Sequence, residues 1–168
     1  MSLQVTIIAT TNGNNLKLAE LIKSVCEELQ YEIDFINLED QDLPLYTPTQ
    51  EKGGIPEKAI QITETLIKND LMIFVAPEYN GSIPPVLNNM VAWVSRAGED
   101  WRQAFNNKMA VVATHSGGGG LKVCRHMREQ LEHLGTFVHP RPILTNFGKE
   151  FNLDSAKETL SSFKKLIG

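Results

Sequence analysis

The chain has 168 residues, which suits one domain able to bury a sizeable core, and we expect a single domain over residues 1–168. Its 20 acidic and 16 basic residues give a net charge of −4, which argues against nucleic acid or an anionic membrane as a partner. The sequence shows no leader segment and no apolar stretch near about 18 residues, so we predict a cytoplasmic protein without membrane contact. Cys26 and Cys124 lack metal-ligand or CxxC spacing and are expected to be buried thiols, with no metal site.

The first elements of the chain are a strand, a helix and a second strand. A β-branched run at 4–9 predicts the first strand, and the polar loop at 10–15 ends it. A helix follows, because the apolar residues from Leu18 to Leu29 recur on one face. Alternating apolar residues at 31–37 predict the second strand.

The middle of the chain holds an irregular segment and then a helix, a strand and another helix. Residues 38–55 carry prolines, glycines and acids, and so long a connection often marks a functional loop. A helix is predicted over 56–69, and the uninterrupted apolar run at 71–76 predicts a fully buried third strand. The proline-bounded loop at 77–85 leads into a helix over 86–94.

The last part of the chain continues the same alternation. A fourth strand is predicted at 109–114, and it ends in the glycine run at 116–120. The next helix directs its apolar residues between Cys124 and Leu134 inward. A fifth strand at 136–143 contains prolines, which suits a sheet edge, and Asp154 is expected to cap the last helix.

Five strands alternating with helices predict an α/β fold with a doubly wound, five-stranded parallel sheet and helices on both faces. The commonest strand order at this length is 2-1-3-4-5, whose switch point lies between the first and third strands. The unusual loops at 10–15, 77–82 and 115–120 follow the first, third and fourth strands. We therefore expect them to meet at one end of the sheet and to form a binding site.

The three loops suggest different parts of one ligand, although each also has a simpler explanation. The hydroxyls and amides at 10–15 precede a helix N-terminus, which suits a phosphate, or else form an ordinary helix cap. The glycines at 117–120 allow a flat ligand to approach the backbone, or else form a loose turn. Tyr79 can stack on a ring or simply cover the sheet, and His115 can face a ligand or support the fold. A ligand with a phosphate at one end and a flat heteroaromatic ring at the other, such as FMN, fits this arrangement.

The stretch at 77–84, with the downstream 93–96 and the glycine run at 116–120, resembles the flavodoxin-like NAD(P)H-dependent FMN reductases. That family includes bacterial quinone, chromate and azo-dye reductases, and the resemblance covers essentially the whole chain. It implies a flavodoxin-like fold, with FMN and NAD(P)H as cofactors. By resemblance the ribityl phosphate would be held by Thr10, Thr11, Asn12, Asn14, Asn15 and Leu16. The isoalloxazine would be lined by Pro77, Glu78, Tyr79, Asn80 and Gly81. Its pyrimidine side would be closed by Ser116, Gly117, Gly118 and Gly119.

One part of the sequence departs from the family pattern. The first loop of the family usually reads Gly-Ser/Thr-x-Arg, whereas this chain has Ala9-Thr10-Thr11-Asn12. Without the arginine the loop lacks a bidentate, charge-assisted contact to phosphate that a neutral asparagine does not replace.

The expected activity is hydride transfer from a nicotinamide to bound FMN, followed by transfer of two electrons to a quinone, azo dye, metal oxyanion or free flavin. The flavin carries the chemistry, so no catalytic side chain is expected, and backbone amides near Gly81 and Gly117–Gly119 would stabilise negative charge on the reduced ring. A one-electron carrier like flavodoxin and a non-catalytic FMN-binding protein remain alternatives. The resemblance also predicts a homodimer or homotetramer, and we expect the apolar residues around Trp93 to form a subunit contact, unless the chain's own loops cover them.

Overall fold

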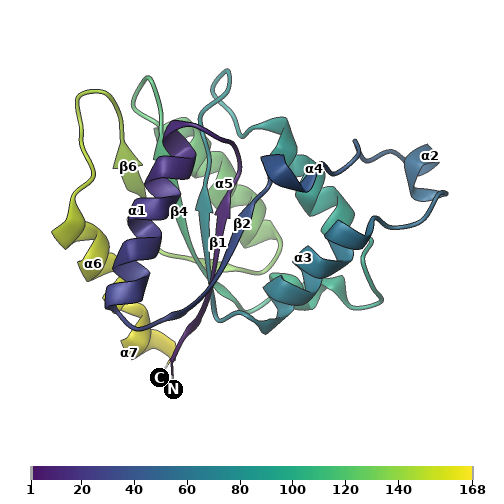
Figure 1. The fold of residues 1–168 in the computed structure, drawn as a ribbon, viewed down its shortest axis with the longest axis horizontal. Helices are drawn as coiled ribbons and strands as arrows, with labels where there is room; N and C mark the ends of the chain where they lie inside the picture. Colours follow the sequence, from purple (N-terminus) through teal and green to yellow (C-terminus); the bar gives the residue numbers. More distant parts are fainter. Residues whose placement is uncertain (1, 168) are drawn as a thin grey trace.

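The computed structural model describes residues 2–167 and places the strands of that range in one sheet between two layers of helices (Figure 1). The strands are β1 (Gln4–Ala9), β2 (Glu32–Asn37), β3 (Leu71–Val75), β4 (Met109–His115), β5 (Phe137–Val138) and β6 (Ile143–Thr145). Their order is β2-β1-β3-β4-β5, β6 also pairs with β4, and each of these pairs is parallel. The predicted parallel, doubly wound sheet and its order are confirmed.

The helices divide between the two faces of the sheet. The α-helices are α1 (Asn14–Glu28), α2 (Pro48–Glu51), α3 (Glu57–Lys68), α4 (Pro85–Val94), α5 (Leu121–His133), α6 (Leu153–Ser161) and α7 (Phe163–Ile167), and the 3₁₀ turns are η1 (Glu39–Gln41) and η2 (Trp101–Ala104). The buried residues of α1, α6 and α7 share one core, and those of α3, α4 and α5 share the other. Figure 1 shows α1 and α6 on one side of the strands, with α3 and α4 on the other.

Strand β3 lies at the centre of both cores, which explains its uninterrupted apolar sequence. Leu71, Ile73 and Val75 pack with the α1 side, while Met72 and Phe74 pack with the α5 side. Each of these side chains is buried, as expected for a strand covered on both faces.

The predicted fifth strand is divided in two. Instead of one strand over 136–143, the short strands β5 and β6 pair with successive parts of β4. Pro140 and Pro142 lie between them and cannot donate to a strand ladder. The Arg128 guanidinium of α5 donates to the carbonyl of Val138, at 3.0 Å, and to that of His139. A side chain therefore satisfies carbonyl groups where the strand pairing stops.

The C-terminal helix begins earlier than predicted and is interrupted. Asn152 is the N-cap rather than Asp154, because its side chain accepts a hydrogen bond from the Ser155 amide at 2.8 Å. Asp154 instead lies in the first turn, where its charge favours the helix dipole. A break at Ser162 separates α6 from α7, and Phe163 is still buried, as the spacing predicted.

The irregular segment over 38–55 covers the outer side of α4. Trp93 is fully buried, and its indole Nε1 donates to the Pro44 carbonyl at 2.7 Å. The Asn89 side chain accepts from the Tyr46 amide at 2.7 Å and donates to the Pro44 carbonyl at 3.0 Å. The Tyr46 ring meets Trp93 edge-on, with 5.2 Å between the ring centroids. The Trp93 side chain that was expected to make a subunit contact is therefore covered by the chain itself, as the alternative explanation required.

Within residues 2–167, no helix combines the length and apolar character needed to cross a membrane.

Candidate functional site

The loops that follow β1, β3 and β4 leave the sheet side by side, as their positions in the sequence predicted. Backbone hydrogen bonds continue past the strand ends, from the Thr10 amide to Val75 at 3.0 Å and from the Ala76 amide to Ala113 at 3.1 Å. The three loops therefore lie at the carboxyl end of the sheet, opposite the chain termini in Figure 1. In open parallel sheets, ligands bind at this end.

The first loop ends at the N-terminus of α1. Within the described residues 2–167 no side chain caps this helix, and its first turn contains no acidic residue. The first backbone amides of a helix have no intrahelical acceptor, and here the Lys17 amide is the one that bonds back to Gly13, at 3.1 Å. Asn14 is exposed and Thr11 is half-buried at the entrance. The free amides and the positive end of the helix dipole form a suitable place for an anion.

Two of the residues expected to contact a phosphate point inward. Thr10 is fully buried, and its hydroxyl donates to the Val75 carbonyl at 3.2 Å. The Asn15 side chain donates to the His115 carbonyl at 2.9 Å and accepts from the His115 amide at 2.8 Å. These two side chains hold the loops together. The polar side chains of the first loop that reach solvent are therefore those of Thr11, Asn12 and Asn14.

The loop after β3 forms a small hairpin. Tyr79 and Ser82 exchange backbone hydrogen bonds at 2.9 and 3.0 Å, and Asn80 and Gly81 between them have φ of 51° and 78°. Positive φ at both central positions is typical of a type I′ turn, for which Asn-Gly is the preferred dipeptide. The turn therefore explains Asn80 and Gly81. It does not explain Tyr79, whose large side chain is 48% exposed.

The hairpin is fixed to the first turns of α5. The Glu78 carboxylate accepts from the Val123 amide at 3.4 Å, and Ser82 hydrogen-bonds His126 at 3.1 Å. Gly120, at the N-cap of α5, has no side chain that could cap this helix, so Glu78 supplies the capping group from another loop. Pro77 is buried beneath the hairpin. Among the residues expected to line a ring, Tyr79 and Asn80 are the ones most open to solvent.

The glycine run contains one residue that the fold requires and three that it does not. Gly120 has φ of 68°, and a Cβ there would lie 2.6 Å from the Thr114 methyl group. Gly117, Gly118 and Gly119 are exposed, have no positive φ, and a Cβ on any of them would meet nothing within 4 Å. Neither backbone conformation nor packing within residues 2–167 explains the absence of side chains at these three positions.

The Ser116 side chain fixes the conformation of the glycine run. Its side chain is buried, and its hydroxyl hydrogen-bonds both the amide and the carbonyl of Gly118, at 3.2 and 3.0 Å. The exposed glycines therefore lie on a folded turn with a defined shape.

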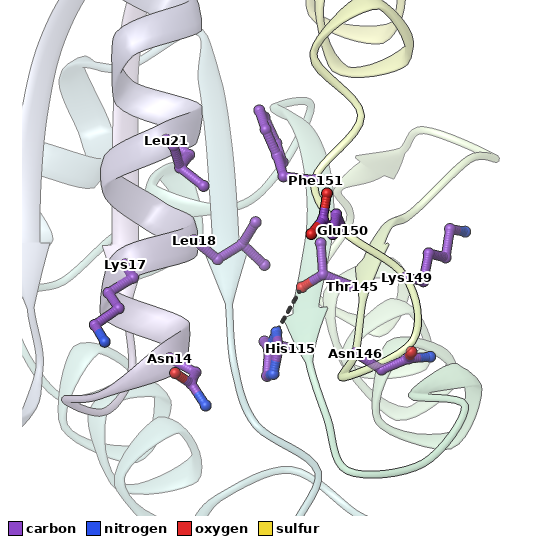
Figure 2. A pocket seen from close by; sticks show the side chains of 10 residues that line it. All are labelled: Asn14, Lys17, Leu18, Leu21, His115, Thr145, Asn146, Lys149, Glu150 and Phe151. Atoms are coloured by element: carbon purple, nitrogen blue, oxygen red, sulfur yellow. Dashed lines mark hydrogen bonds between the residues drawn. The ribbon is translucent and has the colours of Figure 1, made fainter.

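A cleft of about 250 Å³ adjoins the site on the α1 side and shares Asn14 and His115 with it. Figure 2 shows His115 between α1 and the segment over 145–151, with its ring directed to Thr145. The ring Nδ1 lies 3.0 Å from the Thr145 hydroxyl, and Phe147 meets the ring edge-on. These contacts give His115 a supporting role in the fold, while its Nε2 is buried and has no hydrogen-bond partner among residues 2–167.

Glu39 is a residue at this site that the sequence interpretation missed. Its carboxylate accepts a hydrogen bond from the Asn12 amide at 2.7 Å. The available signal was the position of Glu39 just after the second strand, because the predicted order places that strand beside the first.

The thiols take no part in the site. Burial, reinforced by Glu27, raises the pKa of Cys26 to about 12. Burial, reinforced by Glu78, likewise raises the pKa of Cys124 to about 12. Both thiols are therefore protonated at neutral pH and are poor nucleophiles. Across residues 2–167, no group of three or more His, Cys, Asp or Glu side chains is arranged to hold a metal ion.

Known proteins share both the fold and the sequence pattern of this chain. It is 33% identical over 104 residues to a quinone reductase of Escherichia coli, an alignment that covers 60% of this chain and 54% of that protein. It is 32% identical over 129 residues to an NAD(P)H-dependent FMN reductase of Pseudomonas aeruginosa, covering 76% of this chain and 65% of that protein. The chain thus spans between half and two thirds of the length of these curated relatives.

A solved structure has the same fold at low sequence identity. The flavoenzyme NAD(P)H:(acceptor) oxidoreductase FerB from Paracoccus denitrificans superposes with a TM-score of 0.74 at 19% identity, covering 98% of this chain and 94% of FerB. The family described as NADPH-dependent FMN reductase matches residues 4–149, which include all three loops of the site. The chain belongs to the NADPH-dependent FMN reductase family.

Proposed function

We propose that the protein is an NAD(P)H-dependent FMN oxidoreductase that passes two electrons to a small acceptor such as a quinone. The observation that carries this proposal is the bare surface of Gly117, Gly118 and Gly119, for which the fold offers no reason. A flat ligand that lies against the backbone supplies the reason, since a Cβ would stand in its way.

The chemistry of the site suits the two ends of FMN. At one end, the free amides of α1, the half-buried Thr11 and the exposed Asn12 and Asn14 suit the ribityl phosphate. At the other end, the exposed Tyr79 offers an aromatic side chain on the hairpin that is fixed to α5, the helix that follows the bare glycines. Four other predicted site residues would support FMN binding indirectly, because their hydrogen bonds hold the loops in position. They are Thr10, Asn15, Glu78 and Ser116.

Bound FMN would accept a hydride from NAD(P)H and return two electrons to the acceptor, which is chemistry that side chains do not supply. The protein's part is to bind, orient and stabilise. The Gly118 amide already donates to the Ser116 hydroxyl, so the amides of Gly117 and Gly119 would be the ones to stabilise negative charge at the edge of the ring. The Tyr79 hairpin, fixed to α5 by Glu78, would border the pocket for the nicotinamide and the acceptor.

Reconstitution and turnover test the proposal together. We expect the purified protein to bind FMN with its visible absorption spectrum and to oxidise NAD(P)H in the steady state when a 1,4-benzoquinone is added. FMN binding without NAD(P)H oxidation would instead indicate an electron carrier or a non-catalytic binder, and a stable one-electron reduced form in a titration would identify the carrier. Failure to bind FMN at all would refute the proposal.

The homodimer or homotetramer and the cytoplasmic location belong to the same proposal. Leu45 is 74% exposed on the segment that covers α4, which leaves an apolar side chain available for a subunit contact. The two buried, free cysteines suit a reducing compartment. Sedimentation of the purified protein tests the oligomer, and a single species with the mass of one chain would contradict it.

A further inference from the structure

An acidic side chain from another segment contacts the loop that the proposed function assigns to the phosphate. Glu39 begins the turn η1 directly after β2, and β2 is the sheet neighbour of β1. Its carboxylate accepts a hydrogen bond from the backbone amide of Asn12 at 2.7 Å. A carboxylate thus binds one of the loop's amides as a phosphate oxygen would.

The polar groups around this contact make the loop still less favourable for an anion. Asn37 donates to the Asn12 side chain and to the Asp40 carboxylate, both at 2.8 Å. A second carboxylate is thereby held beside the same loop. Residues 10–15 contain no lysine or arginine, so the donors there are neutral amides and hydroxyls.

We propose that Glu39 is a specificity-determining residue, which lowers the affinity of the first loop for the dianionic phosphate of FMN. It thereby reduces the factor by which FMN binds more tightly than unphosphorylated riboflavin. The proposal rests on the proposed function, because it assigns the phosphate to this loop. The Asn12 amide cannot serve the Glu39 carboxylate and a phosphate oxygen at once, so the carboxylate must move away when phosphate binds. Its negative charge then remains near the phosphate and repels it.

Exchanging Glu39 for glutamine separates charge from shape. Glutamine has the same length, and its carbonyl oxygen can still accept the Asn12 hydrogen bond, but it carries no charge. Because Glu39 is exposed, the exchange is not expected to disturb the core. Glu39→Ala goes further, since it also frees the amide.

Flavin binding by fluorescence quenching provides the test, with FMN and riboflavin titrated separately into each protein. We expect Glu39→Gln to bind FMN about tenfold more tightly than the wild type, equivalent to about 1.4 kcal/mol, with no change for riboflavin. The gain should shrink as the ionic strength rises from about 0.01 M to about 1 M, because the screening length falls from ~30 Å to ~3 Å. Glu39→Ala should gain at least as much as Glu39→Gln.

Glu32→Gln is the matched control. It removes the same charge from the opposite end of β2, about 16 Å from Asn37 at ~3.3 Å per residue, where Glu32 contacts Gln4. We expect it to leave both affinities unchanged.

The possible outcomes distinguish this inference from the proposed function. If the wild type binds both flavins but Glu39→Gln changes neither affinity, or changes both equally, the role of Glu39 is refuted and the proposed function stands. An equal gain in FMN affinity in Glu32→Gln would show that the effect comes from the net charge of the protein, and would also refute the role of Glu39. If no variant binds either flavin, the proposed function and the inference fall together.

Discussion

Replacing Gly118 by valine tests whether the absence of a side chain at this position serves the fold or a bound ligand. Among residues 2–167, a Cβ at Gly118 would meet nothing within 4 Å, and Gly118 does not have a positive φ. The flavin-free variant should therefore fold normally. It should even be more stable, because replacing a glycine by a larger residue at a compatible position lowers the conformational entropy of the unfolded chain. This effect raises the free energy of unfolding by about 0.4–1 kcal/mol. For a chain of this size, that corresponds to a rise in Tm of about 2–4 °C per kcal/mol.

The same substitution should weaken FMN binding. The new methyl groups would keep the ring at least ~3.5 Å from themselves, which moves it away from backbone donors that must lie within about 3.2 Å to bond. Losing two hydrogen bonds of about 1 kcal/mol each implies an affinity at least about tenfold weaker.

Two assays and one control decide the outcome. Thermal unfolding of the flavin-free protein measures stability, and fluorescence quenching measures FMN affinity. Gly120→Ala should behave in the opposite way and lower Tm, because its Cβ would lie 2.6 Å from the Thr114 methyl group at a φ of 68°. A Gly118→Val protein that folds normally and binds FMN with wild-type affinity would remove the glycine run from the site.

Three further predictions concern the other loops. Tyr79→Ala should slow the reduction of bound FMN by NAD(P)H more than it weakens FMN binding, because the phosphate and glycine contacts remain. Stopped-flow reduction at saturating FMN measures this rate, and a wild-type rate would leave Tyr79 a packing role only. Wild-type protein should bind FMN at least about tenfold more tightly than riboflavin, and equal affinities in both the wild type and Glu39→Gln would contradict a phosphate site in the first loop. Asn15→Ala should cost about 1–3 kcal/mol of unfolding free energy, because the His115 amide and carbonyl lose their partners, and an unchanged Tm in thermal unfolding would contradict this role.

The sequence predicted the sheet well because its signals there are local. The buried run of β3 and the alternation of strands and helices are visible within short windows, and the crossover rule then restricts the order. The division of the fifth strand was only hinted at by its prolines, because the Arg128 side chain that completes it belongs to another element. Trp93 was assigned to a subunit contact because the segment that covers it lies 49 residues earlier in the chain.

The site was predicted at the level of loops but not of individual side chains. Residue type alone does not reveal whether a polar group faces a ligand or a neighbouring strand. Thr10 and Asn15 have the chemistry of phosphate ligands, yet their hydrogen bonds go to Val75 and His115. The same limit concealed Glu39, whose role depends on the pairing of β2 with β1 rather than on any local motif.

The pairing of Asn15 with the His115 backbone also bears on how the protein acquires its site during folding. The two residues are 100 positions apart: Asn15 lies in the first turn of α1, which follows β1, and His115 ends β4, while β3 separates β1 from β4 in the sheet. Contacts of such long sequence separation pay their loop-closure entropy before they form. β1 and α1 come early in the chain, but their position against the glycine turn depends on β4. The loops of the site therefore come together only once β4 has joined the sheet, so flavin binding would report that β1, β3 and β4 have assembled.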